Sequence, residues 1–284
     1  MTDKPTTADG YPPELAVEAK QMCLYVATIL GDLLDDVAVV GGLVPYLLID
    51  QATAPADARH VGTRDVDLGL ALALLNEERY REIARRLRDR GFAQATNERG
   101  NPTRQTWALA DARVTLDFLI PPVAKGQRPG SLQNLEADFA AIVMPALPLA
   151  FLDTVTVALN DVTPRGERAR RMVRVAGPAA FVTMKAHAFR IRGANKDAYD
   201  LVYVLTHHGD DPVAGVAQAF TRIADEPEAR QALDFLAEDF ASVDHVGPKR
   251  HAEFLGDRDD DVYRQDAVGV VLAFLAAVGR RETS

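Results

Sequence analysis

The sequence predicts an α/β fold in two lobes: an α/β lobe of residues 1–176 that carries a mixed sheet, and a helical lobe of residues 177–284. Two observations lead to this prediction. Apolar and alternating runs typical of strands recur up to residue 175, whereas beyond Gly177 only the helical spacing of apolar residues is found. The chain of 284 residues is also long enough to bury two separate cores.

In the first lobe, strands alternate with helices. A helix is favoured after Pro12-Pro13, and the apolar run at residues 37–40 ends in a Gly41-Gly42 turn. Helices are expected at residues 14–34, 43–49 and 76–90. Strands are expected at residues 37–40, 64–70, 106–110, 113–120, 154–159 and 172–175, of which the third and fourth form a hairpin. Residues 1–13 are expected to be a short disordered lead, residues 51–63 an exposed loop and residues 163–171 an arginine-rich loop.

The second lobe is predicted to be a bundle of helices. Helical periodicity recurs at residues 179–191, 196–205, 213–224, 229–240 and 262–278. His207-His208 stand at the end of one of these helices without a Cys or a third well-spaced His, which excludes a zinc site. A charge interaction of these histidines with the helix end is the expected alternative.

Composition and charge limit the class of protein. Hydrophobic residues make up 48% and charged residues 26%, which is typical of a folded globular chain. The single cysteine, Cys23, lies in an apolar helical pattern and has no partner for an intrachain disulfide, so we expect a reducing cytoplasm. No apolar run approaches the ~18 residues of a membrane span, so no membrane partner is expected. The net charge of -9 argues against nonspecific coating of nucleic acid but allows a local basic patch.

Paired aspartates carry the strongest chemical signal. Residues two apart on a strand project from the same face, so Asp65 and Asp67 deliver two carboxylates to one point. Oxygen-rich, doubly negative sites suit Mg²⁺, with Mn²⁺ as a substitute. Asp117 interrupts an otherwise apolar strand, and it completes a three-carboxylate site if that strand neighbours the first; it would then activate an attacking hydroxyl. Otherwise Asp117 is a solvent-facing strand residue.

Glycines and lysines add weaker signals. Gly41 and Gly42 precede a helix, so their backbone suits close approach to a phosphate, although a structural turn is the plainer interpretation. Lys185 lies near the polar edge of its predicted helix, where a solvated lysine is the plainer interpretation. Lys196 and Asp200 are four residues apart and are compatible with a surface ion pair. The arginines near residues 165–174 are equally consistent with contact to RNA phosphate and with a merely solvated loop.

These motifs resemble a known family. Gly-Gly, a spacer, Asp-hydrophobic-Asp and a later strand aspartate resemble the polymerase-β type of nucleotidyltransferase over residues 37–120. Residues 184–190 (MKAHAFR) and 195–201 (NKDAYDL) are similar to the lysine helix and the Lys-Asp-x-x-Asp-Leu helix of AbiEii-type toxins of type IV toxin–antitoxin and phage-abortive systems. The resemblance implies that Gly41 and Gly42 bind triphosphate, Asp65 and Asp67 bind metal, Lys185 binds nucleotide phosphate and Asp200 supports catalysis. Arg64, Lys196 and Asp197 complete the candidate nucleotide-binding set.

The resulting functional hypothesis is a metal-dependent nucleotidyltransferase that works in a cleft between the lobes. It would transfer NMP from an NTP to an acceptor hydroxyl, with the tRNA 3′ end as preferred acceptor and a cognate antitoxin as a further partner. The loop of residues 51–63 is expected to close over the substrate. Two alternatives stay open: a small-molecule, aminoglycoside-like nucleotidyltransferase, which the acidic charge would suit, and a nucleotide-binding regulatory module without turnover.

Overall fold

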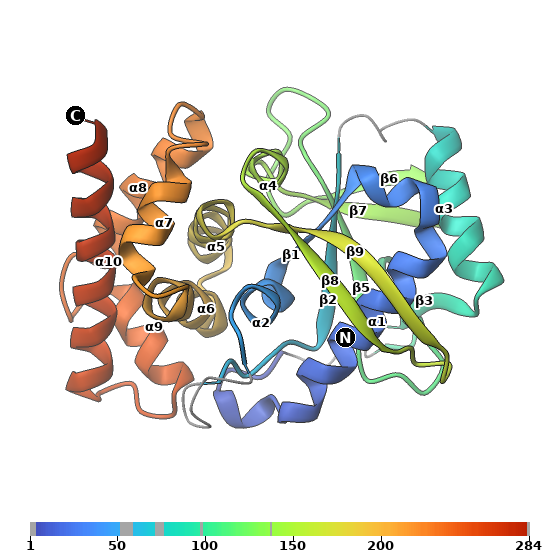
Figure 1. Ribbon diagram of the computed structural model, residues 1–284, viewed down its shortest axis with the longest axis horizontal. Coiled ribbons are helices and arrows are strands. Elements are labelled where there is room, and N and C mark those ends of the chain that lie inside the picture. The colour runs from blue at the N-terminus through green and yellow to red at the C-terminus, as the bar shows by residue number, and fades with distance from the viewer. Residues whose placement is uncertain (1–3, 52–58, 72–76, 97–98, 137, 283–284) are drawn as a thin grey trace.

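The computed structural model describes residues 4–51, 59–71, 77–96, 99–136 and 138–282 (Figure 1). Within these residues, nine strands form one mixed sheet in the order β3-β4-β5-β2-β1-β9-β8, and β7 pairs with both β5 and β6. The strands are β1 (Val37–Val40), β2 (Asp65–Leu70), β3 (Phe92–Thr96), β4 (Pro102–Leu109), β5 (Thr115–Ile120), β6 (Leu132–Glu136), β7 (Phe139–Val143), β8 (Thr154–Val162) and β9 (Arg168–Ala176).

Helices cover the sheet and form the second lobe. The first lobe contains α1 (Pro13–Leu30), α2 (Val44–Leu48), α3 (Glu77–Asp89) and α4 (Leu149–Leu152), with 3-10 turns at Ala8–Gly10, Gly31–Asp36 and Gly41–Leu43. The second contains α5 (Pro178–Arg192), α6 (Asn195–His207), α7 (Pro212–Phe220), α8 (Pro227–Asp239), α9 (Val246–Phe254) and α10 (Asp261–Glu282). Figure 1 shows α5 to α10 gathered at one end of the molecule and the sheet with α1 and α3 at the other. The predicted α/β lobe with a mixed sheet and the helical C-terminal lobe are thus confirmed.

The join between the lobes is fixed by a buried carboxylate. Asp153 is fully buried after α4, and its Oδ2 accepts hydrogen bonds from the backbone N–H groups of Ala179 and Ala180 at 2.9 and 3.0 Å. These N–H groups belong to the first turn of α5, which has no partner for them within the helix. A Cβ on Gly177 would lie 2.3 Å from the Asp153 carboxylate, so only glycine fits there. That these lobes are separate folding domains stays a prediction.

Some sequence expectations need correction. The strands β3, β6 and β7 and the helices α4 and α9 were not expected. Gly247 and Pro248 weaken the local helix signal of α9, which is stabilised instead by packing against α6. The helix expected at residues 43–49 is only the five-residue α2. In the predicted β4–β5 hairpin, which is confirmed, Asp111 turns the chain with a φ of +63°, a left-handed conformation that aspartate tolerates.

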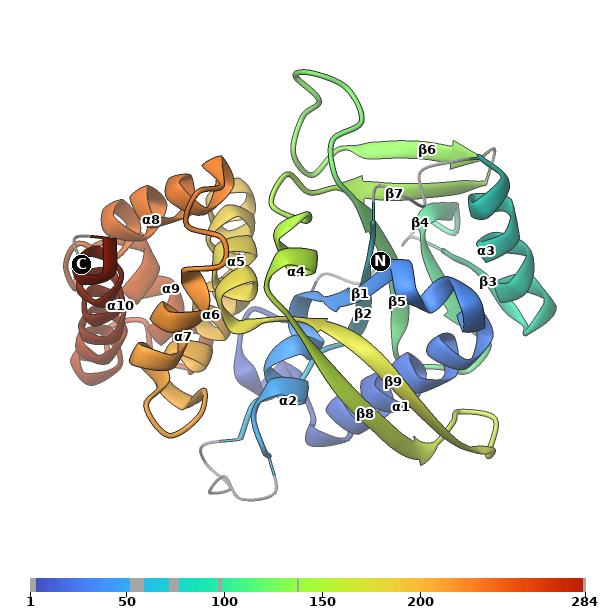
Figure 2. The ribbon, with the colours of Figure 1, turned by 45° about the horizontal axis from the view of Figure 1, so that its top comes forward.

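The arginine-rich segment is mainly strand rather than loop. β8 and β9 pair over nine residues each, from Thr154↔Ala176 to Val162↔Arg168, so the connecting loop is residues 163–167 alone. Arginines have a weak preference for strands, so the sequence does not indicate a strand here. Hydrogen bonding to β8 nevertheless holds the segment in a strand. Figure 2 shows this hairpin running beside α1 and away from the helical lobe.

Residues 4–12, the described part of the N-terminal lead, are ordered, contrary to expectation. Tyr11 is buried with its ring centroid 5.8 Å from that of Phe254, and Asn195 Nδ2 donates a hydrogen bond to Thr6 O at 3.0 Å. The segment therefore lies against the helical lobe. Packing against residues distant in sequence supplies this order, which a polar, proline-containing stretch does not reveal by itself.

Two further features concern the helical lobe. Burial lowers the pKa of both His207 and His208, which disfavours the expected charge interaction with the helix end. The expectation that no apolar run approaches the length of a membrane span is wrong for Asp261–Gly279 of α10, whose 19 residues are long and apolar enough to cross a membrane by length and composition. The same property is found in helices of soluble bundles, and α10 packs against α7 and α9.

Candidate active site

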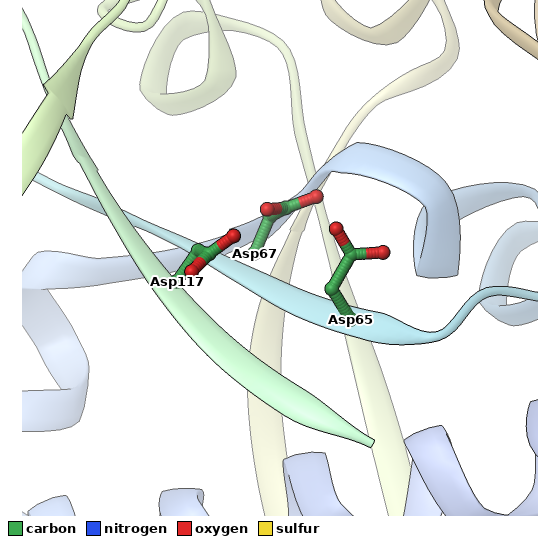
Figure 3. A group of neighbouring side chains, drawn as sticks. All are labelled: Asp65, Asp67 and Asp117. Carbon is green, nitrogen blue, oxygen red and sulfur yellow. The ribbon is translucent and has the colours of Figure 1, made fainter. Parts of the chain in front are cut away.

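Three aspartates from two neighbouring strands meet at one point (Figure 3). β2 runs parallel to β5, and the register places Asp67 directly opposite Asp117. Asp65 lies two residues before Asp67 and projects from the same face. One carboxylate oxygen from each of the three lies within 4.8 Å of the others, and this is the one cluster of three His, Cys, Asp or Glu side chains of metal-binding geometry among the described residues. The adjacency on which the role of Asp117 depended is therefore present.

The electrostatics of this cluster favour a cation. Burial, and then the charge of Asp65, raise the pKa of Asp67 to about 7 and that of Asp117 to about 6. Burial also acts to raise the pKa of Asp65, but the ammonium of Lys4 and the hydrogen bonds from Lys4 and Thr63 outweigh it and hold that pKa well below its usual range. The site thus contains more negative charge than its neighbours neutralise.

The aspartates fit a divalent metal. Asp117 Oδ1 is buried and has no hydrogen-bond partner among the described residues, and a bound cation would satisfy this acceptor. Two oxygens bound to one Mg²⁺ lie at most about 4.2 Å apart, so small side-chain rotations bring the three carboxylates into range. Carboxylate oxygens are also the ligands that Mg²⁺ and Mn²⁺ prefer.

The two glycines after β1 make room for the aspartates and their neighbours. Gly41 has a φ of +69°, and a Cβ there would lie 1.8 Å from Asp67 Oδ2. A Cβ on Gly42 would lie 2.7 Å from the hydroxyl oxygen of Thr63, which itself donates to Asp65 Oδ1 at 2.8 Å. The helix that follows, α2, has only five residues, so it is too short to attract a phosphate strongly through its dipole. Glycine is required at both positions because the backbone passes close to Asp67 and Thr63. Phosphate binding by the two glycines stays a prediction.

A buried cluster of ion pairs in the helical lobe faces the aspartates. Lys185 Nζ from α5 lies 2.9 Å from Asp197 Oδ1 and 2.7 Å from Asp200 Oδ2, both on α6. Lys196 Nζ lies 2.6 Å from Asp200 Oδ1, and Arg192 Nε lies 2.6 Å from Asp197 Oδ2. Asp197 and Asp200 are buried, and so is Lys185. The solvated lysine and the surface ion pair are therefore wrong descriptions of Lys185 and of Lys196 with Asp200.

His60 completes this cluster, although no sequence pattern had marked it as a candidate residue. Its ring is buried between Tyr199 and Tyr203, with ring centroids 5.4 and 4.8 Å away. Its Nδ1 accepts a hydrogen bond from the Gly62 N–H at 3.0 Å, so Nε2 carries the proton and donates to Asp200 Oδ1 at 2.9 Å. Burial lowers the His60 pKa to about 4, which keeps the ring neutral. His60 thereby ties the segment before β2 to α6.

A pocket of about 310 Å³ lies between the aspartates and this cluster. It is lined by Lys4, Pro5, Thr6, Tyr11, Gly42, Thr63, Asp65, Asp67, Lys185, Arg192, Gly193, Ala194, Asn195, Lys196, Asp197, Asp200 and Arg250. Seven of these were predicted site residues: Gly42, Asp65, Asp67, Lys185, Lys196, Asp197 and Asp200; the others, among them Lys4, Tyr11, Thr63, Arg192 and Arg250, were not. Lys4 Nζ forms an ion pair with Asp65, and the charge of Asp65 raises the Lys4 pKa. The expected cleft between the lobes therefore exists, with the N-terminal segment inside it.

Three candidate residues lie outside the lining of this pocket: Gly41, Asp117 and Arg64. Asp117 sits behind Asp65 and Asp67, on the next strand. Arg64 is half-buried, and its backbone oxygen accepts a hydrogen bond from the Thr115 N–H at 3.0 Å, which joins the starts of β2 and β5. The side chain of Arg64 leaves the strand on the side opposite to Asp65. Part of the closing loop, residues 52–58, lies outside the described residues, whereas His60 to Thr63 are held by the contacts above.

A mixed sheet with three aspartates on two adjacent strands, a strand–Gly-Gly turn beside them and a facing helical lobe is the arrangement expected of a nucleotidyltransferase. The family model of the nucleotidyl transferase AbiEii toxins of type IV toxin–antitoxin systems matches residues 58–268. The chain belongs to this family of nucleotidyltransferase toxins. No curated protein matches it significantly.

Proposed function

We propose that the protein transfers NMP from an NTP to the 3′-terminal hydroxyl of tRNA, in the cytoplasm, as the toxin of a pair with a cognate antitoxin. The observation that carries this proposal is the meeting of Asp65, Asp67 and Asp117, of which the first two line a pocket whose opposite wall carries cations. Separate carboxylates and cations of this kind suit a triphosphate that is bound through a divalent metal.

The aspartates would hold Mg²⁺, or Mn²⁺ in its place. When bound, the ion supplies positive charge that neutralises the triphosphate and the developing charge on its reacting phosphorus. The orphaned Asp117 Oδ1 and the raised pKa of Asp67 both support this assignment, because each marks a carboxylate oxygen without enough neutralising contacts.

The opposite wall would position the triphosphate. Lys185, Lys196 and Arg192 contribute three positive charges, and Asp197 and Asp200 contribute two negative ones, so the wall keeps one net positive charge. Arg192 has the most exposed side chain of the three, at 53%, so it reaches a ligand most easily. We assign Lys185 and Lys196, together with Arg192, to orienting phosphate oxygens in the pocket, and Asp197 and Asp200 to holding these cations in place.

The Gly41-Gly42 turn and Asp117 have the remaining roles. Gly42 lines the pocket, and its lack of a side chain lets a phosphate approach the backbone. Asp117 accepts the proton of the acceptor hydroxyl, a role that suits a carboxylate whose pKa is raised to about 6. The hydroxyl oxygen then bonds to the α-phosphorus as pyrophosphate leaves, so NTP and acceptor become NMP-acceptor and pyrophosphate.

The test is incubation of the purified protein with total tRNA, Mg²⁺ and each α-labelled NTP in turn. The Asp65→Asn, Asp67→Asn double variant is the negative comparison. The matched control is Asp210→Asn, Asp225→Asn, which makes the same charge change at two exposed positions. Label on tRNA with the wild type and control, and none with the active-site variant, is the expected result.

Two other results would favour a different function. Label on a cationic small molecule and never on RNA would favour the aminoglycoside-like activity, for which the net charge of -9 is the supporting observation. NTP binding without any metal-dependent product, across RNA and small-molecule acceptors, would favour a regulatory module without turnover.

A further inference from the structure

The β8–β9 hairpin exposes one face that carries a row of arginines. Cross-strand register pairs Thr156 with Arg174, Ala158 with Met172, Asn160 with Arg170 and Val162 with Arg168. Side chains opposite each other in an antiparallel pair share a face, and all eight of these residues are exposed. The other face of the hairpin, which includes Leu159 and Val173, packs against α1. We call the exposed set the arginine face.

The arginine face lies on the same side of the sheet as the catalytic aspartates. Asp67 is opposite Val40 of β1, and Ala38, two residues before Val40, is opposite Arg174 of β9. Because alternate residues share a face and paired residues share a face, Arg174 and Asp67 belong to the same side. Two strand spacings of about 4.8 Å separate β9 from β2, so the row begins beside the site.

The row then leads away from the site. Arg168, Arg170 and Arg174 extend over seven residues of β9, and the six steps from the first to the last correspond to about 20 Å at 3.3 Å per residue. This length exceeds what an NTP bound at the aspartates needs. Arginines two apart on a strand are separated by about 6.6 Å, a spacing comparable to that of successive phosphates along a nucleic acid strand.

The charge of this face is unbalanced. Within the described part of the chain, Arg168, Arg170 and Arg174 form no ion pair; Arg174 donates to the backbone oxygen of Asp35 instead. The acidic residues of the hairpin lie elsewhere: Asp161 faces α1, where Lys20 Nζ is 3.0 Å away, and Glu167 is in the turn. Arginines outside the hairpin are mostly paired, as Arg85 is with Glu82 and Arg113 with Glu18.

We propose that the arginine face binds the phosphate backbone of the RNA acceptor and directs its 3′ end to the aspartates. The inference rests on the proposed function, because it identifies the surface that the acceptor uses. Arginine side chains suit phosphate through forked, charge-assisted hydrogen bonds. A chain with net charge -9 that keeps three arginines in one row, with no acidic partner among the described residues, has a local surface for a polyanion in a molecule that otherwise repels one.

The test compares three variants in equilibrium tRNA binding and in steady-state kinetics. Arg168→Gln, Arg170→Gln removes two charges from exposed positions. Arg168→Lys, Arg170→Lys keeps the charge, and Arg230→Gln, Arg258→Gln removes two charges in the helical lobe. Fluorescence anisotropy with labelled tRNA is measured between about 50 and 200 mM salt, the range over which phosphate contacts change affinity steeply.

For the glutamine variant we expect tRNA affinity to fall about tenfold and the salt slope of log K to fall by about 1.4 to 1.8. The KM for tRNA should rise correspondingly while kcat and the KM for NTP stay unchanged. The lysine variant should keep most of the affinity, and the helical-lobe control should match the wild type. Unchanged tRNA binding and KM in the glutamine variant would overturn the inference while leaving the transferase activity intact.

The remaining outcomes separate this inference from the proposed function. If the wild type binds tRNA through these arginines but labels no RNA, the surface is supported and the proposed function fails. Absence of tRNA binding by the wild type refutes the surface whatever the enzyme activity. If polyglutamate binds the face as tightly as tRNA does and is equally weakened in the glutamine variant, the partner is an acidic protein and the RNA assignment is overturned.

Discussion

Asp67 and Asp117 stand directly opposite each other on the adjacent parallel strands β2 and β5. Burial, and then the charge of Asp65, raise the pKa of both carboxyl groups, and the charge of Asp117 raises that of Asp67 further. Such an arrangement lowers the stability of the metal-free protein. Proteins keep such destabilising carboxylates at functional sites when the same charges are needed to bind a ligand.

The substitution Asp117→Asn should abolish activity and stabilise the metal-free fold. We expect NMP transfer to fall by at least about 100-fold, because the proton acceptor is lost. The raised pKa means that the folded state holds its proton more tightly than the unfolded state, so stability falls as pH rises from about 4 to about 6. At pH 8 with chelator, the variant should gain about 2 to 3 kcal/mol in urea unfolding. Asp259→Asn, at an exposed position, should change neither quantity.

Lys4→Gln should tighten metal binding. The Lys4 ammonium forms an ion pair with the Asp65 carboxylate, although 48% of the Lys4 side chain is exposed. A metal ion that binds Asp65 must therefore displace Lys4. We expect the Kd for Mn²⁺, measured by electron paramagnetic resonance, to fall by about five- to tenfold, because removal of a unit charge near the site lowers repulsion. Lys125→Gln, which changes an exposed lysine outside the pocket, serves as control. An equal or weaker affinity in Lys4→Gln would show that the N-terminal segment does not compete with the ion.

Lys185→Met should destabilise the protein as well as inactivate it. Lys185 is buried between Asp197 and Asp200, and its removal leaves two buried carboxylates short of a partner. Loss of one partner from a buried pair typically costs about 3 to 5 kcal/mol. Urea unfolding at pH 7.5 measures the loss, and Lys249→Met, at a half-buried surface ion pair, should cost below about 1 kcal/mol. A stable but inactive Lys185→Met would mean that the lysine serves the nucleotide alone.

Acid should weaken the link that His60 makes between the lobes. Its folded pKa of about 4 lies below the unfolded value near 6.5, so the unfolded state takes up a proton first and stability is lost as pH falls from about 6.5 to 4. The contribution of this ring is about 3 kcal/mol. His60→Gln should lack this part of the pH dependence in urea unfolding at pH 4.5 and 7.5. The exposed His245→Gln should retain it, and an identical slope in both variants would contradict the assignment.

The sequence alone was sufficient for the order of elements around the paired aspartates. Alternation along residues 65–70 requires Asp65 and Asp67 to share a face, since this follows from strand geometry and not from neighbours. Helical periodicity similarly indicated α1, α3 and most helices of the second lobe. The Asp-x-Asp and Lys-Asp-x-x-Asp-Leu motifs led to the family that the chain belongs to.

Only the tertiary structure decided which residues meet. The β2–β5 register brings Asp117 to Asp67 across 50 positions, and the β9–β1–β2 register places the arginine face beside the aspartates. His60 and Lys4 have ordinary neighbours in sequence, and their contacts with Asp200 and Asp65 arise because chain segments 140 and 61 residues apart pack together. Periodicity reports the direction of a side chain relative to its own element. Strand pairing and lobe packing, which depend on the whole chain, determine what that side chain touches.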